Sequence, residues 1–295
     1  NNVTRVKKGD KIALNWAPNC GKCFYCNNAR PSLCESYTDF IWNGYLMDGT
    51  TRMSINGKPL YHYCALSCLS EYAVVPEASC VKMPNEIPDD VVALIGCAVT
   101  TGVGSTLNTV QIKKDDTVAV LGAGGVGLST IMGAAYAGAS QIIAIDIVSG
   151  KEIIARKVGA TDFLLSSQET IKQINSITNN CGVDYAFEAV GIPKLQELAF
   201  EIVRPGGTLI LSGITPMGSK TNFSGAILTR QEKTVKGSYY GSSDTSRDFH
   251  KYADLFLAGK LPIDKMISRS YNLDQINEAY TDMLSSKGGR GIIRF

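Results

Sequence analysis

One stretch of the chain, Thr117 to Ile145, constrains the fold more than any other. It contains no charged residue, and Asp116 and Asp146 flank it at its two ends. An uncharged stretch of this length can cross a bilayer. Its six glycines, however, follow an apolar run and accompany a helical pattern that extends to about Ala137. This order is typical of a strand, a tight turn and a helix, so the sequence predicts a βα unit rather than a membrane span.

The alternation of short apolar runs and helical patterns continues beyond this unit. The expected strands lie near 118–121, 142–145, 163–165, 185–187 and 208–211, and the expected helices near 151–158, 168–178 and 195–203. Apolar runs of about four residues that alternate with helices of about ten predict βαβ units and a doubly wound parallel sheet.

The regions on either side of this sheet have a different pattern. Residues 1–98 contain short apolar runs at 11–15 and 72–75 and a polar loop at 38–59, and they predict a β-rich, irregular part. After Gly237 the alternation stops, and only a helix near 246–258 and a tail remain. Because the tail is too short to fold alone, we expect it to pack on one of the other two parts.

The glycines that follow the first strand form the pattern Gly122-x-Gly124-Gly125-Val126-Gly127. In this pattern the first glycine permits a tight turn, the second admits a pyrophosphate close to the backbone, and the third lets helix and strand pack closely. Free N–H groups at the start of the helix would bind phosphate. The alternative is a glycine turn that serves packing only.

Asp146 ends the next expected strand, well beyond Gly127. A carboxylate at this position can accept hydrogen bonds from the ribose hydroxyls of an adenosine, and it would repel a 2′-phosphate. Since no arginine follows within the next few residues, the sequence favours NAD over NADP as cofactor.

Four of the nine cysteines, Cys20, Cys23, Cys26 and Cys34, lie close together in one short segment. Four thiolates in one short loop suit a tetrahedral structural zinc ion that leaves no position for water. Disulfides, unrelated buried thiols and an iron–sulfur cluster remain as alternatives.

The other cysteines and the two histidines give weaker indications of metal binding or catalysis. Cys64, Cys68, Cys80 and Cys181 are expected to be small core residues. A second metal site from His62, Cys64 and Cys68 would lack a fourth ligand. His62 and His250 are expected to be surface or structural residues.

Composition excludes several classes of partner. The net charge is +2 and no block of five or more basic residues occurs, so nothing favours nucleic acid. We see no signal-peptide pattern and expect a cytoplasmic protein with no membrane segment. The chain opens at Asn1 in a turn-like sequence, and we expect further sequence upstream.

Taken together, these motifs resemble the zinc-dependent medium-chain alcohol dehydrogenase family over essentially the whole chain. The resemblance rests on the cysteine loop, on Gly122–Gly127 with Asp146, and on Ile95-Gly96-Cys97-Ala98-Val99-Thr100-Thr101-Gly102. It implies a Rossmann domain at 99–239 and a GroES-like catalytic domain formed by 1–98 and 240–295, with the active site between them. The long loop between Cys34 and Tyr63 is similar to that of the dimeric branch.

By this resemblance, Cys97 is a ligand of a catalytic zinc and Thr101 lies against the nicotinamide. Further positions match contacts to the adenosine ribose (Lys151), the nicotinamide carboxamide (Ile214), the pyrophosphate (Arg290) and the substrate (Tyr63 and Cys64). The implied reaction is hydride transfer between an alcohol or aldehyde and NAD. The other two protein ligands of the catalytic zinc and the proton relay would lie upstream of Asn1.

The sequence leaves alternatives open for the substrate and for the enzymatic role itself. The stretch after Cys34 lacks the arginine of the glutathione-adduct branch, so we favour simple primary or aromatic alcohols. A polyol or amino-acid alcohol dehydrogenase of the same family is one alternative. Another is a non-catalytic, zinc-stabilised NAD-binding protein, in which Cys97 would be a core thiol.

Overall fold

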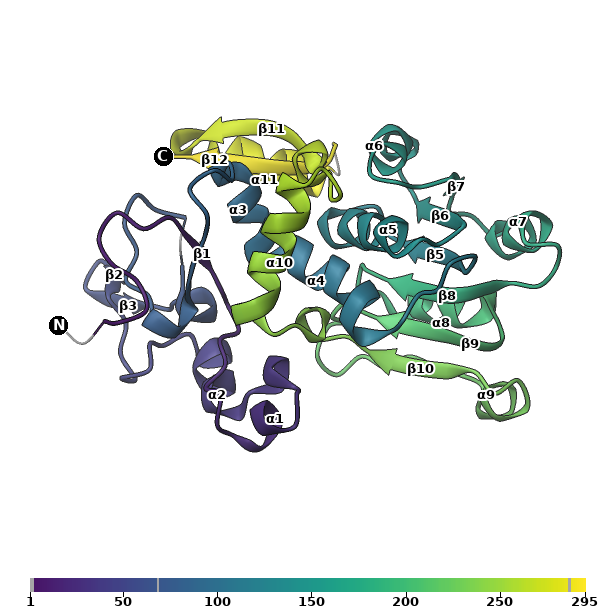
Figure 1. Cartoon of the computed structure of the whole chain (residues 1–295), viewed down its shortest axis with the longest axis horizontal. Coiled ribbons are helices and arrows are strands. Elements are labelled where there is room, and N and C mark those ends of the chain that lie inside the picture. The colour runs from purple at the N-terminus through teal and green to yellow at the C-terminus, as the bar shows by residue number, and fades with distance from the viewer. Residues whose placement is uncertain (1–2, 68, 286–287) are drawn as a thin grey trace.

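The computed structural model describes residues 3–67, 69–285 and 288–295. A parallel sheet with its helices forms one half of the molecule, and shorter elements from both ends of the chain form the other (Figure 1). Asn1 and Asn2 lie outside the described residues. The turn expected near the start is present at Lys7–Asp10, where the Asp10 N–H donates to the Lys7 carbonyl.

The sheet has six parallel strands in the order β10-β9-β8-β5-β6-β7. The strands are β5 (Thr117–Leu121), β6 (Gln141–Asp146), β7 (Asp162–Leu165), β8 (Val183–Glu188), β9 (Val203–Leu211) and β10 (Thr234–Gly237). The doubly wound sheet is therefore confirmed, with β10 as a strand that the sequence did not predict. The chain winds outward from β5 in one direction and then returns to β8 on its other side. The strand order thus reverses between β5 and β8, where ligands bind in folds of this type.

Helices cover both faces of the sheet. They are α5 (Gly125–Ala137), α6 (Glu152–Lys157), α7 (Thr170–Ile177), α8 (Pro193–Ile202) and α9 (Gly225–Arg230). Val118 and Val120 of β5 share one hydrophobic cluster with Leu128 of α5. Ala119 lies in the opposite cluster with Ala199 of α8. Both faces of β5 are therefore buried, which explains why its sequence is apolar without interruption.

A long helix from Asp89 to Thr109 connects the two halves. It consists of α3 (Asp89–Leu94), a π-helical turn (η4, Ile95–Val99), α4 (Thr100–Gly104) and a second π-helical turn (η5, Ser105–Thr109). Among the described residues it is the helix that is long and apolar enough to span a membrane, but 78% of its most apolar window is buried inside the protein. The expected domain boundary at 98/99 falls inside this helix.

Small residues let this helix pack tightly on α5. A Cβ atom added at Gly102 would lie 2.4 Å from the Val126 carbonyl oxygen, and one at Gly133 would lie 2.2 Å from the Thr106 hydroxyl. One hydrophobic cluster therefore runs from the sheet through this helix into the other half.

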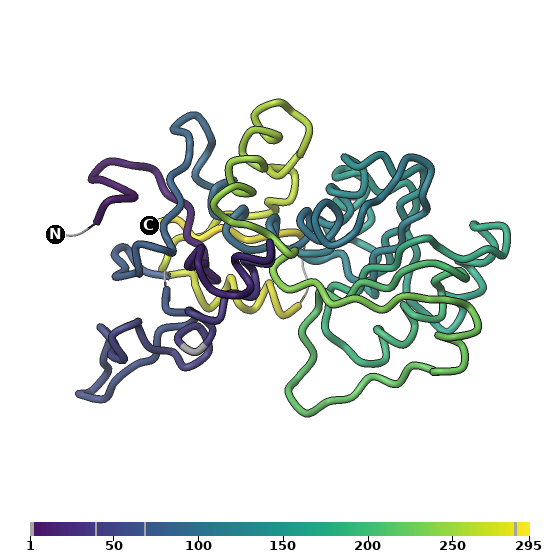
Figure 2. Tube along the Cα trace, turned by 60° about the horizontal axis from the view of Figure 1, so that its bottom comes forward, coloured from purple at the N-terminus to yellow at the C-terminus, as the bar shows by residue number. Residues whose placement is uncertain are grey.

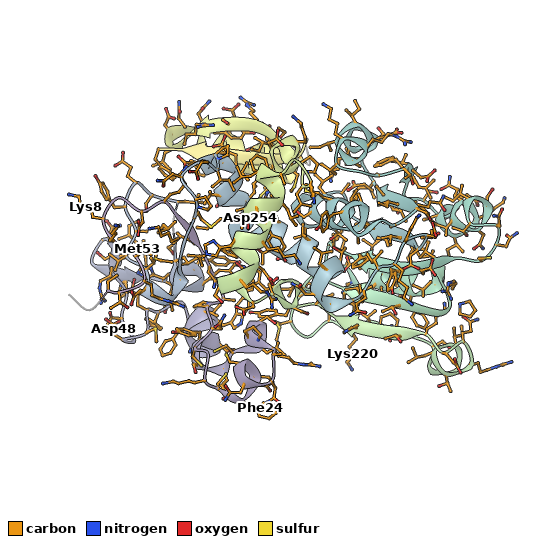
Figure 3. All side chains as sticks on the ribbon, viewed as in Figure 1. Lys8, Phe24, Asp48, Met53, Lys220 and Asp254 are labelled. Atoms are coloured by element: carbon orange, nitrogen blue, oxygen red, sulfur yellow. The ribbon has the colours of Figure 1, made fainter. Side chains whose placement is uncertain are left out.

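The first part of the chain is irregular with short strands, as expected, and the run at 11–15 forms one of them. Its helices and strands are β1 (Ile12–Leu14), α1 (Phe24–Asn27), α2 (Glu35–Asn43), β2 (Met53–Ile55), β3 (Lys58–Leu60) and β4 (Cys80–Lys82). Asn56 and Gly57, both with left-handed φ, form the turn of the β2–β3 hairpin. Residues 72–75 form no strand, and the loop expected at 38–59 contains the end of α2 and the hairpin. Figure 3 shows Phe24, which is 67% exposed, at the tip of the α1 lobe.

The C-terminal part returns to the first half, as expected (Figures 1 and 2). It comprises α10 (Thr245–Leu257), β11 (Ile267–Asn272), α11 (Ile276–Leu284) and β12 (Arg290–Arg294). Arg294 forms an ion pair with Asp90 of α3, and the Asn15 amide donates to Thr245 Oγ1 at 2.6 Å. The remaining short helical turns are η1 (Pro31–Leu33), η2 (Tyr63–Ala65), η3 (Glu77–Ser79), η6 (Ser149–Lys151), η7 (Tyr240–Ser242), η8 (Ile263–Met266) and η9 (Leu273–Gln275).

Candidate functional site

The thiol of Cys97 lies in the π-helical turn of the connecting helix. Its neighbours Gly96 and Ala98 are buried, whereas Cys97 itself is exposed. Burial by surrounding protein atoms still raises the pKa of the Cys97 thiol, against a lowering by the charge of Arg290. The thiol is thus accessible at the surface although protein atoms partly desolvate it, and π-helical turns are frequent at functional sites.

In the glycine turn after β5, a side chain would find open space at Gly124 but none at Gly127. Gly124 is exposed, and a Cβ atom added to it would meet nothing within 4 Å. A Cβ atom at Gly127 would lie 1.7 Å from the Gly122 carbonyl oxygen. The half-buried Gly125 and Val126 begin α5, which directs its free N–H groups towards this turn.

Arg290 from β12 lies over the start of α5. A Cβ atom at Gly125 would lie 2.7 Å from Arg290 Cδ, and Arg290 Nε is buried without a hydrogen-bond partner. A buried donor without a partner is costly, and a phosphate oxygen would satisfy it. The open space at Gly124, the helix N-terminus and this unpartnered donor together fit a pyrophosphate.

The Asp146 carboxylate lies at the end of β6, next to the glycine turn. Its Oδ2 accepts from the Ala123 N–H at 2.7 Å and pairs with Lys151 Nζ at 3.0 Å, while Oδ1 accepts from the Val148 N–H at 3.0 Å. The Asp146 side chain is only 6% exposed. The carboxylate is thus fixed beside the turn, and a lone pair of Oδ1 is left for a ribose hydroxyl.

Thr101 and Ile214 come from different elements, α4 and the segment that follows β9. Thr101 is buried on α4, and its carbonyl oxygen would lie 2.9 Å from a Cβ atom at Gly241. Ile214 follows β9 and is 68% exposed, and its carbonyl packs against Gly191. The Ser212 hydroxyl is buried without a partner.

Tyr63 and Cys64 lie close enough to Cys97 to interact electrostatically. The nearby Cys64 raises the pKa of Tyr63, with burial and Cys97 adding to the effect. Burial, followed by the charge of Cys97, raises the pKa of Cys64 to about 11. Tyr63 is 78% exposed, whereas Cys64 is buried with a left-handed φ of 52°.

Aromatic side chains that the sequence analysis did not single out lie beside this group. The rings of Trp16 and Tyr240 are 4.5 Å apart, and Tyr239 contacts Trp16 at 5.4 Å. The Tyr240 hydroxyl donates to the carbonyl of Gly96, the residue before Cys97, at 2.5 Å. Only the fold brings residues 16, 97 and 240 together, so no local pattern could have shown this arrangement.

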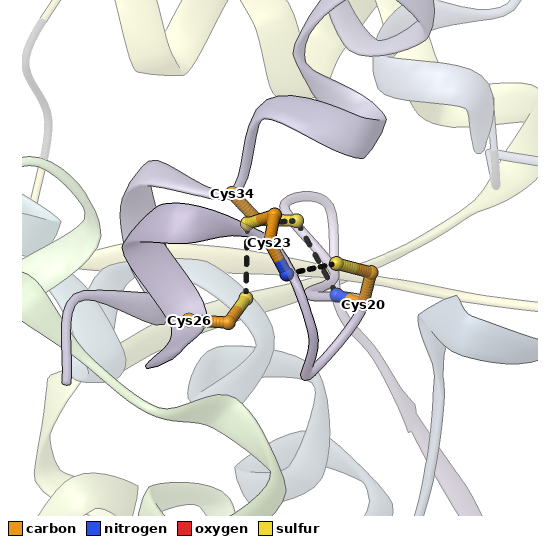
Figure 4. Close-up of side chains that lie close together, drawn as sticks. All are labelled: Cys20, Cys23, Cys26 and Cys34. Carbon is orange, nitrogen blue, oxygen red and sulfur yellow. Dashed lines mark hydrogen bonds between the residues drawn. The ribbon is translucent and has the colours of Figure 1, made fainter. Parts of the chain in front are cut away.

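The four cysteines of the lobe converge as expected (Figure 4). Their sulfur atoms all lie within 4.8 Å of one another. A hydrogen bond from the Ser36 side chain, followed by those that the Cys20 sulfur accepts from the Lys22 and Cys23 N–H groups, lowers the pKa of Cys20 to about 6. Four soft ligands at this spacing, one already favoured as thiolate, fit a tetrahedral zinc ion.

The expectations for the remaining cysteines and histidines are met only in part. Cys64 is buried and Cys80 is half-buried, but Cys181 is exposed, so its assignment to the core was wrong. Cys181 follows the left-handed residues 179 and 180 in the turn before β8, which holds it at the surface. Cys68 lies outside the described residues. His62 is buried, and its Nε2 accepts from the Arg52 N–H at 3.1 Å, which suits a structural histidine.

Comparison with known proteins identifies the family. Residues 1–85 match the alcohol dehydrogenase GroES-like domain, and residues 125–258 match the zinc-binding dehydrogenase domain. The chain is 37% identical to alcohol dehydrogenase class-3 from Myxine glutinosa over 295 residues, covering 99% of this chain and 78% of that protein. The chain belongs to the zinc-dependent medium-chain alcohol dehydrogenase family.

Other members of this zinc-dependent family agree with the assignment. The NDMA-dependent alcohol dehydrogenase of Amycolatopsis methanolica is 34% identical over 294 residues, which are 99% of this chain and 79% of that protein. The crystal structure of benzyl alcohol dehydrogenase from Acinetobacter calcoaceticus superposes with a TM-score of 0.91 at 28% identity, covering 100% of this chain and 80% of that one. Family membership and the four-cysteine cluster support zinc and NAD(P) as cofactors.

Proposed function

We propose that this protein is a zinc-dependent oxidoreductase that transfers a hydride between an alcohol or aldehyde and NAD. The exposed Cys97 thiol carries the proposal, because Arg290, which we assign to the cofactor, and Cys64, which we assign to the substrate pocket, both interact with it electrostatically. A core thiol, as a non-catalytic protein would have, does not fit this exposure.

In this proposal each group of residues has a separate task. Gly122, Gly124 and Arg290 bind the pyrophosphate, and Gly125–Gly127 present the helix N-terminus to it. Asp146 and Lys151 bind the adenosine ribose, while Thr101 and Ile214 orient the nicotinamide. Cys97 contributes to a catalytic zinc site. When bound, zinc acts as a Lewis acid towards the substrate oxygen, and the nicotinamide exchanges the hydride.

NAD is preferred over NADP in this proposal because of Asp146. The carboxylate is fixed by three donors and cannot swing away from a 2′-phosphate. Lys151, which lies beside it, is already paired with this carboxylate.

We further propose that the substrate is a primary alcohol with an aromatic or similarly apolar group. The ring of Trp16, which packs on the buried Tyr240, and the exposed ring of Tyr63 near Cys97 would supply an apolar wall for such a group. The similar solved structure of a benzyl alcohol dehydrogenase supports the same substrate class.

The proposal also covers domains, assembly and location. Residues 1–98 with 240–295 would form the catalytic domain, and 99–239 the NAD-binding domain. A homodimer is proposed from the resemblance of the loop between Cys34 and Tyr63 to that of the dimeric branch. We also propose a cytoplasmic location, because cysteines gathered in one cluster as metal ligands are typical of intracellular proteins rather than of secreted disulfide scaffolds.

The substitution Cys97→Ala tests the central claim. We expect alcohol oxidation to fall by about a thousandfold or more, since a metal ligand is lost, while NADH binding measured by fluorescence stays within about twofold. Cys181→Ala, which removes an exposed thiol elsewhere, serves as the matched control and leaves both unchanged. Turnover near the wild-type rate in Cys97→Ala would refute the assignment.

A further inference from the structure

A carboxylate without an assigned role lies at the point where the strand order reverses. Glu188 is the last residue of β8, directly beside β5, and it is fully buried. No ion pair joins it to a cation in the described part of the chain. Burying an unpaired carboxylate is expensive unless hydrogen bonds replace its water.

Hydrogen bonds from the following loop and from α8 satisfy the Glu188 side chain. Its Oε1 accepts from the N–H groups of Val190 at 2.8 Å and Gly191 at 2.7 Å. Its Oε2 accepts from Gln196 Nε2 at 3.3 Å, and Gln196 Oε1 in turn accepts from the Thr221 hydroxyl at 2.6 Å. The carboxylate therefore fixes the backbone of the loop after β8.

The main chain of Glu188 fixes a second loop. Its carbonyl accepts from the Ser212 N–H at 2.9 Å and the Gly213 N–H at 3.0 Å. A Cβ atom at Gly213 would lie 2.6 Å from Glu188 Oε2, so this loop passes directly over the carboxylate. One residue thus holds the loops after β8 and after β9.

The loop after β8 touches the candidate cofactor site, and the loop after β9 packs on that loop. A Cβ atom at Gly122 would lie 2.4 Å from Val190 Cγ2, which places Val190 against the glycine turn. A Cβ atom at Gly191 would lie 2.3 Å from the Ile214 carbonyl oxygen, so the two loops also pack on each other. A shift of either loop would change the wall of the site.

We propose that Glu188 is a positioning residue that sets the nicotinamide side of the dinucleotide site. This inference rests on the proposed function, because it assumes that NAD binds at the glycine turn. Glu188 touches no cofactor atom itself. It acts by holding Val190, Gly191 and the loop with Ile214 in the arrangement that receives the nicotinamide half.

The substitution Glu188→Gln tests the inference while conserving shape. A glutamine has one acceptor oxygen, and if that oxygen keeps the bonds from Val190 and Gly191, its NH₂ group faces Gln196 Nε2. Two donors then oppose each other unless the Gln196 amide rotates and reverses the direction of its bond with Thr221. In either case the Val190 and Gly191 N–H groups lose a charged acceptor, and hydrogen bonds to a neutral oxygen are weaker. We expect the two loops to loosen without loss of the fold.

The readout compares two ligands that share the adenosine diphosphate ribose. In Glu188→Gln we expect the Kd of NADH to rise about tenfold, as when a hydrogen bond to a charged group is lost, and the Kd of ADP-ribose to stay within about twofold. Kd is measured by fluorescence for NADH and by calorimetry for ADP-ribose. Glu201→Gln, an exposed carboxylate on α8, is the matched control and changes neither Kd.

The possible outcomes separate this inference from the proposed function. Unchanged NADH binding in folded Glu188→Gln, or an equal loss of NADH and ADP-ribose binding, would overturn the positioning role. If Glu188→Gln does not fold, Gln196→Ala supplies the test, with a smaller but equally selective loss of NADH binding expected. Failure of the wild-type protein to bind either ligand would instead overturn the proposed dinucleotide site and this inference with it.

Discussion

Two glycines of the turn after β5 should respond in opposite ways to the same added methyl group. At Gly127 the new Cβ atom would lie 1.7 Å from the Gly122 carbonyl oxygen, whereas real Cβ atoms keep at least 3.0 Å. Turn and helix must therefore move apart before this methyl group fits. At Gly124 nothing lies within 4 Å, so the methyl group enters only the space reserved for a ligand.

The expected magnitudes follow from this contrast. Gly127→Ala overpacks backbone against backbone, and we expect a loss of about 3 kcal/mol of stability and a fall in Tm of roughly 6–12 °C. Gly124→Ala should leave Tm within about 2 °C, because no protein atom has to move. Its affinity for NADH should fall by at least about tenfold, since the pyrophosphate can no longer approach the backbone.

Calorimetric melting and NADH titration of both variants provide the assay. Gly124→Ala with wild-type NADH affinity would show that no dinucleotide lies along this turn. Gly127→Ala with wild-type Tm would show that the turn and α5 do not pack as described. A Gly124→Ala variant that loses NADH affinity only together with a comparable fall in Tm would also contradict the reasoning.

Three further predictions concern the metal lobe, the cofactor and acid stability. Cys26→Ser should lose about one zinc per chain by elemental analysis and lower Tm, since a structural zinc contributes folding energy; an unchanged zinc content would contradict the lobe assignment. Arg290→Ala should weaken NADH binding about tenfold by calorimetry through the loss of a charged donor, and equal affinity would exclude a phosphate contact. The Arg52 guanidinium holds the pKa of Asp48 at about 2, so this carboxylate stabilises the fold above its unfolded pKa, and the contribution is lost as pH falls through the folded value. In urea titrations the stability difference between wild type and Asp48→Asn should therefore shrink as pH falls from about 4 towards 2, and a constant difference would refute this pairing.

The sequence predicted those parts of the fold whose physical causes are local. The run Val118–Leu121 and the glycines after it specify strand, turn and helix within one continuous segment. The spacing of the lobe cysteines likewise brings four ligands within reach of one another inside a single short loop. Both features could be predicted because no distant residue is needed to form them.

Other features depend on contacts between distant residues. The run Tyr72–Val75 has the composition of a strand, but no partner strand pairs with it in the described chain, so it stays irregular. The helix from Asp89 to Thr109 crosses the expected domain boundary, since its small residues meet α5 far along the chain. Glu188 and Asp146 are both acidic residues at the end of a strand, so the sequence alone does not distinguish them. Only the strand order shows that Glu188 lies where the order reverses, between the loops after β8 and β9.

The connecting helix has a mechanical consequence for the chemistry. Cys97 lies on the helix from Asp89 to Thr109, which packs closely against α5 at Gly102 and Gly133. Since α5 begins at the glycine turn, this packing fixes the distance between Cys97 and the turn. Tyr63, which is 78% exposed, belongs instead to the segment between the hairpin and β4. A change in the position of its side chain would therefore widen or narrow the space beside Cys97, while the distance of Cys97 from the glycine turn stays the same.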